Sequence, residues 1–164
     1  MTIGITSYCG APAVGALEAT PKVALGTTVE AIDDSTNPYS AVTLIYLKGV
    51  ASTAAGDVVT YNPKTGATAR LVAGARGPVA VALSACVANK YDWYAVRGVV
   101  SAKSGTVVSG APAFACATTA QVDDADVSGD KIEGMQFVSE VANGLASVAL
   151  TYPTMNGNDV VGGA

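Results

Sequence analysis

A short pattern that occurs twice is the feature of this sequence that most limits its fold. Residues 56–60 read Gly-Asp-Val-Val-Thr, and residues 105–109 read Gly-Thr-Val-Val-Ser. Valine and threonine favour strands, and glycine favours the turns between strands. Each copy is followed by a turn, a short apolar run and a closing strand candidate. The repeat therefore predicts one small β unit built twice.

The rest of the chain has the same punctuation. Short runs rich in valine and threonine are separated by Gly, Pro, Asn or Asp about every ten residues, as in sheets of short strands. Residues 41–47 are apolar on both alternating faces, which indicates cover on both sides, and residues 91–100 form the strongest strand candidate. No segment has a persuasive helical period. We predict an all-β fold, a small β-barrel or sandwich of short strands that includes two related β units.

The chain is predicted to have three parts. Residues 1–22 contain several glycines and prolines and no strand pattern, which indicates an irregular N-terminal arm. Residues 23–153 hold the strand candidates and are predicted to form the β domain. Residues 154–164 end in a glycine-rich stretch and are predicted to be a C-terminal tail.

Charge and hydropathy limit the partners. Only 13% of the residues are charged, the formal net charge is −4, and the nine Lys and Arg residues are dispersed. This composition argues against a nucleic-acid partner. It is typical of a chain that covers its surface with copies of itself or with a large partner, although a slightly apolar monomer is the alternative. No stretch approaches the roughly 20 apolar residues of a membrane helix, and no secretory signal is recognisable, so no membrane partner is expected.

The sequence offers few groups for catalysis. It contains no histidine, which removes the commonest general base and the Ser–His and Cys–His nucleophile pairs. Ser101 and Lys103 lie near each other, but many strands place two such residues together by chance. Cys9, Cys86 and Cys116 lack metal-ligand spacing and are interpreted as buried thiols, with one disulfide and a free thiol as the alternative. We expect no enzyme activity and no cofactor.

One acidic segment resembles half of a calcium loop. Residues 124–129 read Asp-Ala-Asp-Val-Ser-Gly, with glycine at the sixth place, but Met135 stands where a bidentate glutamate is required. The simpler interpretation is a solvated turn in which aspartates cap backbone groups. Weak calcium binding by the turn from Asp123 to Asp130 remains the alternative, and no metal site is assigned.

Aromatic residues concentrate at Tyr91, Trp93 and Tyr94. One interpretation is a core anchor, with Trp93 inside and a tyrosine at the rim. The other is an interface, because Tyr and Trp are enriched at contact hot spots. Tyr8, Tyr91 and Tyr94 are the candidate interface residues.

The order of these strand segments resembles that of the capsid decoration (cement) proteins of tailed bacteriophages. The similarity runs from about residue 23 to residue 153, and one departure is Asp92, where a small residue or glycine is expected before the tryptophan. The segments that carry it are residues 25–27 (Leu-Gly-Thr), 45–51 (Ile-Tyr-Leu-Lys-Gly-Val-Ala), 56–62 (Gly-Asp-Val-Val-Thr-Tyr-Asn), 77–82 (Gly-Pro-Val-Ala-Val-Ala), 91–98 (Tyr-Asp-Trp-Tyr-Ala-Val-Arg-Gly), 122–127 (Val-Asp-Asp-Ala-Asp-Val) and 129–132 (Gly-Asp-Lys-Ile).

The resemblance implies a structural virion protein without catalytic residues. It would be made in the host cytoplasm, bind the outer surface of an assembled phage capsid and bridge subunits of the major capsid protein. It would act as a homo-oligomer, with a trimer favoured and a dimer as the other option. The alternative is another virion or cell-surface structural β module, such as a head fibre base, a tail component or an adhesin-like domain.

Overall fold

Every regular element in the described part of the chain is a β-strand. The computed structural model describes residues 3–6, 8–33 and 40–157, and no helix occurs among them. The strands are β1 (Ile3–Ile5), β2 (Thr28–Asp33), β3 (Ser40–Lys48), β4 (Val58–Tyr61), β5 (Thr68–Arg70), β6 (Gly77–Ala82), β7 (Tyr91–Lys103), β8 (Pro112–Ala115), β9 (Val122–Asp123), β10 (Lys131–Phe137) and β11 (Leu145–Met155). The all-β prediction is confirmed.

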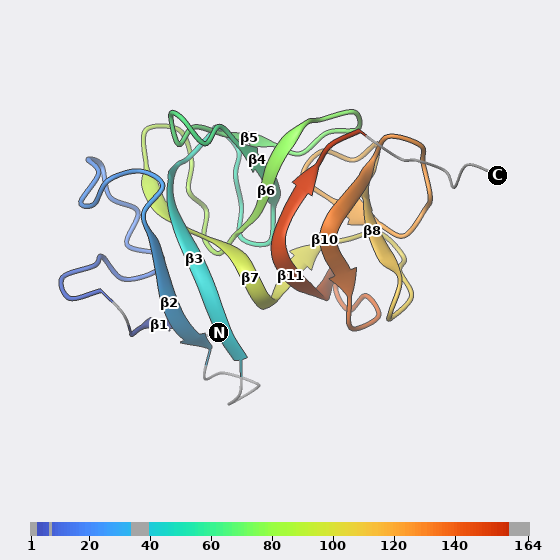
Figure 1. The fold of residues 1–164 in the computed structure, drawn as a ribbon, viewed down its shortest axis with the longest axis horizontal. Helices are drawn as coiled ribbons and strands as arrows, with labels where there is room; N and C mark the ends of the chain where they lie inside the picture. Colours follow the sequence, from blue (N-terminus) through green and yellow to red (C-terminus); the bar gives the residue numbers. More distant parts are fainter. Residues whose placement is uncertain (1–2, 7, 34–39, 158–164) are drawn as a thin grey trace.

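The strands form one antiparallel sheet (Figure 1). Its order is β1-β2-β3-β7-β6-β11-β10-β8-β9, and β4 joins from the side by pairing with β5 and β6. The long strand β7 also pairs directly with β11. No ladder between the described strands closes the sheet into a barrel, so of the two predicted architectures the fold is the sandwich-like one.

Two successive parts of the chain share one pairing scheme. In the first unit, β4 pairs with β5 and β6, and β6 pairs with β7; in the second, β8 pairs with β9 and β10, and β10 pairs with β11. The first part of β7 pairs with β3, and its second part pairs with β11. Isolated parallel bridges, Lys48 with Ala67 and Ser104 with Val122, occupy matching places. The chain thus contains two related β units that share β7.

The register of the repeat differs from the sequence prediction. The Gly56 N–H donates to Ala82 O before β4 begins, at 2.8 Å, and the matching bond before β8 runs from the Gly110 N–H to Phe137 O, also at 2.8 Å. Gly110, and not Gly105, is therefore the counterpart of Gly56. Residues 105–109 form no strand, because the Gly105 N–H bonds to Val122 O and the chain turns away after β7.

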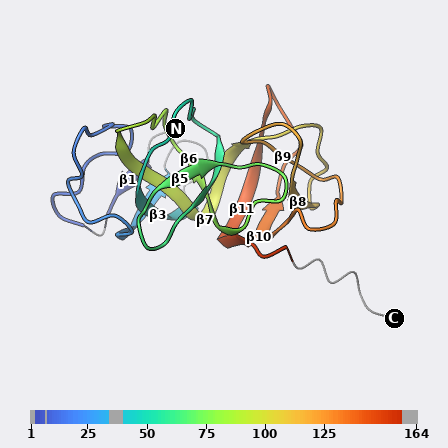
Figure 2. The same ribbon diagram turned by 90° about the horizontal axis from the view of Figure 1, so that it is seen from above.

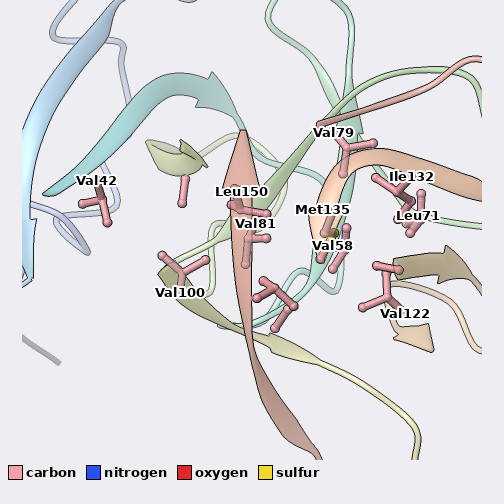
Figure 3. Packing of buried hydrophobic residues seen from close by; sticks show 14 of the residues in the cluster. Val42, Val58, Leu71, Val79, Val81, Val100, Val122, Ile132, Met135 and Leu150 are labelled. Carbon is pink, nitrogen blue, oxygen red and sulfur yellow. The ribbon is translucent and has the colours of Figure 1, made fainter. Parts of the chain in front are cut away.

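The core occupies both faces of the central strands. Leu44 and Trp93 belong to a larger buried cluster, and Leu47 and Tyr94 on the opposite faces of the same strands belong to a smaller one. Residues 42–47 are all buried, which confirms cover on both sides of β3. Figure 3 shows part of the larger cluster, to which the first unit contributes Val58, Leu71 and Val79 and the second contributes Val122, Ile132 and Met135.

The described part of the predicted arm is attached to the sheet. Residues 3–5 pair with β2 as the outermost strand, and the following segment lies beside β1–β3, far from β8 (Figures 1 and 2). The Trp93 indole N–H donates to Pro12 O at 2.8 Å, so the segment covers the tryptophan. At the other end, β11 continues to Met155, and residues 158–164 of the predicted tail lie outside the described residues.

Candidate functional site

A buried carboxylate fastens the N-terminal segment, residues 8–25, to the sheet. Asp92, in β7, accepts hydrogen bonds from the Gly15 N–H at 2.9 and 3.2 Å, from the Ser84 hydroxyl and from the Trp93 N–H. Just beside this cluster, Glu18 and Tyr91 exchange two backbone hydrogen bonds of 3.1 and 3.0 Å. Asp92 is thus an anchor point inside the molecule and does not belong to the surface.

Burial sets the protonation behaviour of Asp92. Removal from water raises the pKa of this carboxyl above its ordinary value, and this effect outweighs the hydrogen bonds from Ser84, Trp93 and Gly15, which lower the pKa. A carboxylate that is held in this way fixes backbone segments.

A second buried carboxylate joins three elements of the first unit. Asp57 lies immediately before β4 and receives the Lys103 ammonium at 2.6 Å and the Arg70 guanidinium at 3.0 Å. It also accepts a hydrogen bond from the Ala54 N–H at 3.1 Å. Because Arg70 belongs to β5 and Lys103 ends β7, this cluster fixes the relative positions of β4, β5 and β7.

Neither carboxylate was singled out as a site by the sequence analysis. Two signals were available in the sequence. Asp92 is a charged residue inside an apolar strand, and Asp57 stands directly before two valines, Val58 and Val59, which are buried. Such aspartates are rarely buried without partners. The pattern therefore predicts a partner but does not identify it.

The acidic turn uses its carboxylates on backbone groups. Asp124 accepts a hydrogen bond from the Val108 N–H at 2.9 Å, and Asp123 accepts one from the Ala125 N–H at 3.1 Å. Asp130 is buried and accepts the Gly74 N–H at 2.6 Å. Among the described residues, no group of three or more Cys, Asp or Glu side chains could hold a metal ion. These contacts favour the turn interpretation, and calcium binding stays an untested hypothesis.

The three candidate interface tyrosines lie in different environments. Tyr8 is exposed, with 47% of its surface accessible, and Tyr91 is half-buried. Tyr94 has 0% exposure because β7 is covered on both faces, so its side chain cannot touch a partner directly. Trp93 is also fully buried, as the core-anchor interpretation required. Burial raises the pKa of the Tyr94 hydroxyl.

The cysteines do not pair in the described chain. All three are free; Cys9 is exposed, Cys116 is partly buried and Cys86 is buried. Burial raises the pKa of the Cys86 and Cys116 thiols, which lowers the thiolate fraction at neutral pH. Only Cys86 matches the buried thiol that the sequence predicted.

The hollows in the surface formed by the described residues include three shallow ones. One of about 310 Å³ crosses β8, β10 and β11 between Pro112 and Ala149. One of about 440 Å³ lies between the β4–β5 hairpin and Arg76. The third, of about 250 Å³, is lined mainly by apolar residues, Leu83 and Leu145 among them. The two buried carboxylates, Asp57 and Asp92, line none of the three.

Comparison with known proteins adds no family assignment. No family model matches the chain, and no curated protein matches it. Among the described residues there is also no helix long and apolar enough to cross a membrane.

Proposed function

We propose that this chain is a structural virion protein that binds the outside of an assembled phage capsid and bridges its major capsid subunits. The observation that supports this most is the use made of the buried carboxylates. Asp57, Asp92 and Asp130 each fasten backbone segments of this chain. Internal bracing of this kind suits a protein that acts by a rigid shape and by adhesion.

The exposed apolar side chains supply the adhesive part of the proposal. They are spread over both units, β2 and the N-terminal segment, and they comprise Tyr8, Ile32, Val72, Val87, Val108, Val127, Val138, Leu145 and Tyr152. Each alone would contribute little. On a shell that presents many identical sites, weak contacts of linked copies combine into strong attachment.

The N-terminal segment, predicted from the sequence as an irregular arm, is hydrogen-bonded to the sheet. Within residues 8–25, Pro12 O accepts the Trp93 indole N–H, and Asp92 accepts the Gly15 N–H. We therefore place the shell contact on the exposed residues, with Tyr8 as the candidate from this segment. The homo-oligomer, as a trimer or a dimer, remains part of the proposal.

Mixing the purified protein with empty shells of its own virus tests the proposal. We expect co-sedimentation that saturates at a fixed number of copies per shell, and no binding to unassembled capsid subunits. Protein that stays in the supernatant at every concentration would contradict a capsid role and favour the alternative of another structural β module. Tyr8→Ala is expected to weaken binding without changing the melting temperature, because Tyr8 is exposed.

A further inference from the structure

The outer edge of β1 has backbone groups that pair with no other described strand. β1 stands at the end of the sheet and pairs only with β2. Its register and the hydrogen bond from the Thr6 N–H to Glu30 O, at 3.0 Å, show that Gly4 faces Ile32 in a hydrogen-bonded pair. Since these pairs alternate along an antiparallel ladder, the N–H and C=O groups of Ile3 and Ile5 point away from β2.

This edge lacks the usual protection. Natural edge strands carry lysines, prolines or bulges that prevent pairing with another chain. Residues 3–5 read Ile-Gly-Ile, with neither charge nor proline. Ile3 and Ile5 are only half-buried although both pack against the larger core cluster, and Ile32 beside Gly4 is 46% exposed. Such an edge has both free hydrogen-bonding groups and apolar surface to cover.

We propose that β1 is a self-association edge, at which two copies of this chain pair their β1 strands antiparallel across a two-fold axis. The strand is self-complementary, because the two residues whose backbone groups point away from β2, Ile3 and Ile5, lie symmetrically about Gly4. In this register Ile3 lies opposite Ile5 of the second copy, and the outward N–H and C=O groups of both residues are satisfied. The isoleucines gain the cover that they lack in one copy, and the two sheets become continuous.

Gly4 provides the test because it would lie on the axis. It would face Gly4 of the second copy in a non-hydrogen-bonded pair, where side chains approach most closely. Within one copy, a side chain added at Gly4 meets no atom within 4 Å. Gly4→Lys and Gly4→Glu therefore place like charges opposite each other in the dimer and leave the single copy undisturbed.

Sedimentation velocity over a concentration series measures the effect. We expect the wild type to show a concentration-dependent dimer and each single variant to dimerise at least tenfold more weakly. An equimolar mixture of Gly4→Lys and Gly4→Glu should dimerise again, with an affinity that falls as salt is added. Val108→Lys, a matched charge at a 62% exposed residue outside β1, should dimerise like the wild type. Equal melting temperatures at low concentration would show that all variants are folded.

The proposal is overturned if the wild type stays monomeric at millimolar concentration. It is also overturned if the Gly4 variants associate like the wild type, or if the mixture of opposite charges does not recover the dimer. It does not depend on the proposed capsid role. Shell binding of Gly4→Lys, measured separately, distinguishes failure of one from failure of the other.

Discussion

Trp93 links the N-terminal segment, β3 and β7 at the scale of single residues. Its ring is fully buried, its centroid lies 4.9 Å from that of Tyr46 at a tilted angle of 58°, and its N–H bonds to Pro12 O. Tilted aromatic pairs of this kind add stability beyond the area that they bury. The tryptophan is therefore the side chain whose loss should affect the most elements together.

We expect Trp93→Ala to lower the free energy of unfolding by about 3–5 kcal/mol, the usual range for a large buried aromatic. Urea unfolding followed by circular dichroism measures this change. Trp93→Phe is the matched control, because it keeps an aromatic ring but loses the hydrogen bond to Pro12. A loss below about 1 kcal/mol for the alanine variant would contradict its burial within one copy.

Asp92 makes stability depend on pH in a defined direction. Its folded-state pKa is raised by burial above the ordinary value of 3.8, so the carboxyl stabilises the fold most when protonated, below that value. This contribution is lost as the pH rises through the folded-state pKa. The stability difference between the wild type and Asp92→Asn should therefore shift against the wild type from pH 3 to pH 7. Urea midpoints of the two proteins test the sign, and a shift in the opposite direction would contradict it.

At the scale of elements, β7 changes partners at Gly98. Arg97 pairs with both β3 and β11, and Gly98, with a positive φ of 103°, is the first residue that pairs with β11 alone. A Cβ at this position would lie 2.6 Å from Ala41 O and 2.7 Å from a Val42 methyl group. In β11, Tyr152 also has a positive φ and lies as far from the start of its strand as Gly98 does in β7. The two units thus share a backbone irregularity as well as a pairing scheme.

We expect Gly98→Ala to destabilise the protein by about 2–3 kcal/mol, because the added methyl group meets backbone atoms and the backbone conformation disfavours alanine. Gly105→Ala is the control. Its added Cβ meets nothing closer than the Asp123 Cβ at 3.7 Å, so it should change stability by less than about 0.5 kcal/mol. Chemical unfolding of both variants decides the point. Equal stability of the two would show that β7 can switch partners without glycine.

At the scale of the whole molecule, the N-terminal segment completes one side of the core. Val14, Val23 and Leu25 pack against the larger cluster, together with Ile3 and Ile5 of β1. The segment thus takes the place of a covering layer on the β1–β3 side of the sheet. Its removal would expose Trp93 and leave Asp92 without the Gly15 N–H.

We expect deletion of residues 2–22 to lower stability by about 3 kcal/mol or more, which for a chain of this size is roughly 6–12 °C in melting temperature. Deletion of residues 2–6 alone removes β1 and should have a clearly smaller effect, because Pro12 and Gly15 stay in place. Thermal unfolding by circular dichroism compares the two. An unchanged melting temperature for the longer deletion would show that the segment is a detachable arm after all.

Part of this fold follows from local sequence, because side-chain alternation and turn residues act over a few positions. The pattern in residues 41–47 predicts a strand covered on both faces, and residues 91–100 are predicted as the strongest strand. Both lie at the centre of the sheet, and Trp93 is buried as one of the two interpretations of the aromatic residues required. The doubled Gly-x-Val-Val pattern correctly indicates two units. It places the start of the second unit at Gly105 instead of Gly110. The reason is that similarity between two pentapeptides does not show whether both lead into paired strands.

What the sequence by itself determined is therefore the all-β class, the central strands and the presence of two units. Only the tertiary structure decided the register of the second unit, the position of residues 8–25 and the burial of Asp57 and Asp92. The reason is that the groups in contact are far apart in the sequence. The Asp92 carboxylate meets the Gly15 N–H across 77 positions, and Asp57 meets Lys103 across 46. No local pattern encodes such contacts, which form only when the sheet brings distant residues together.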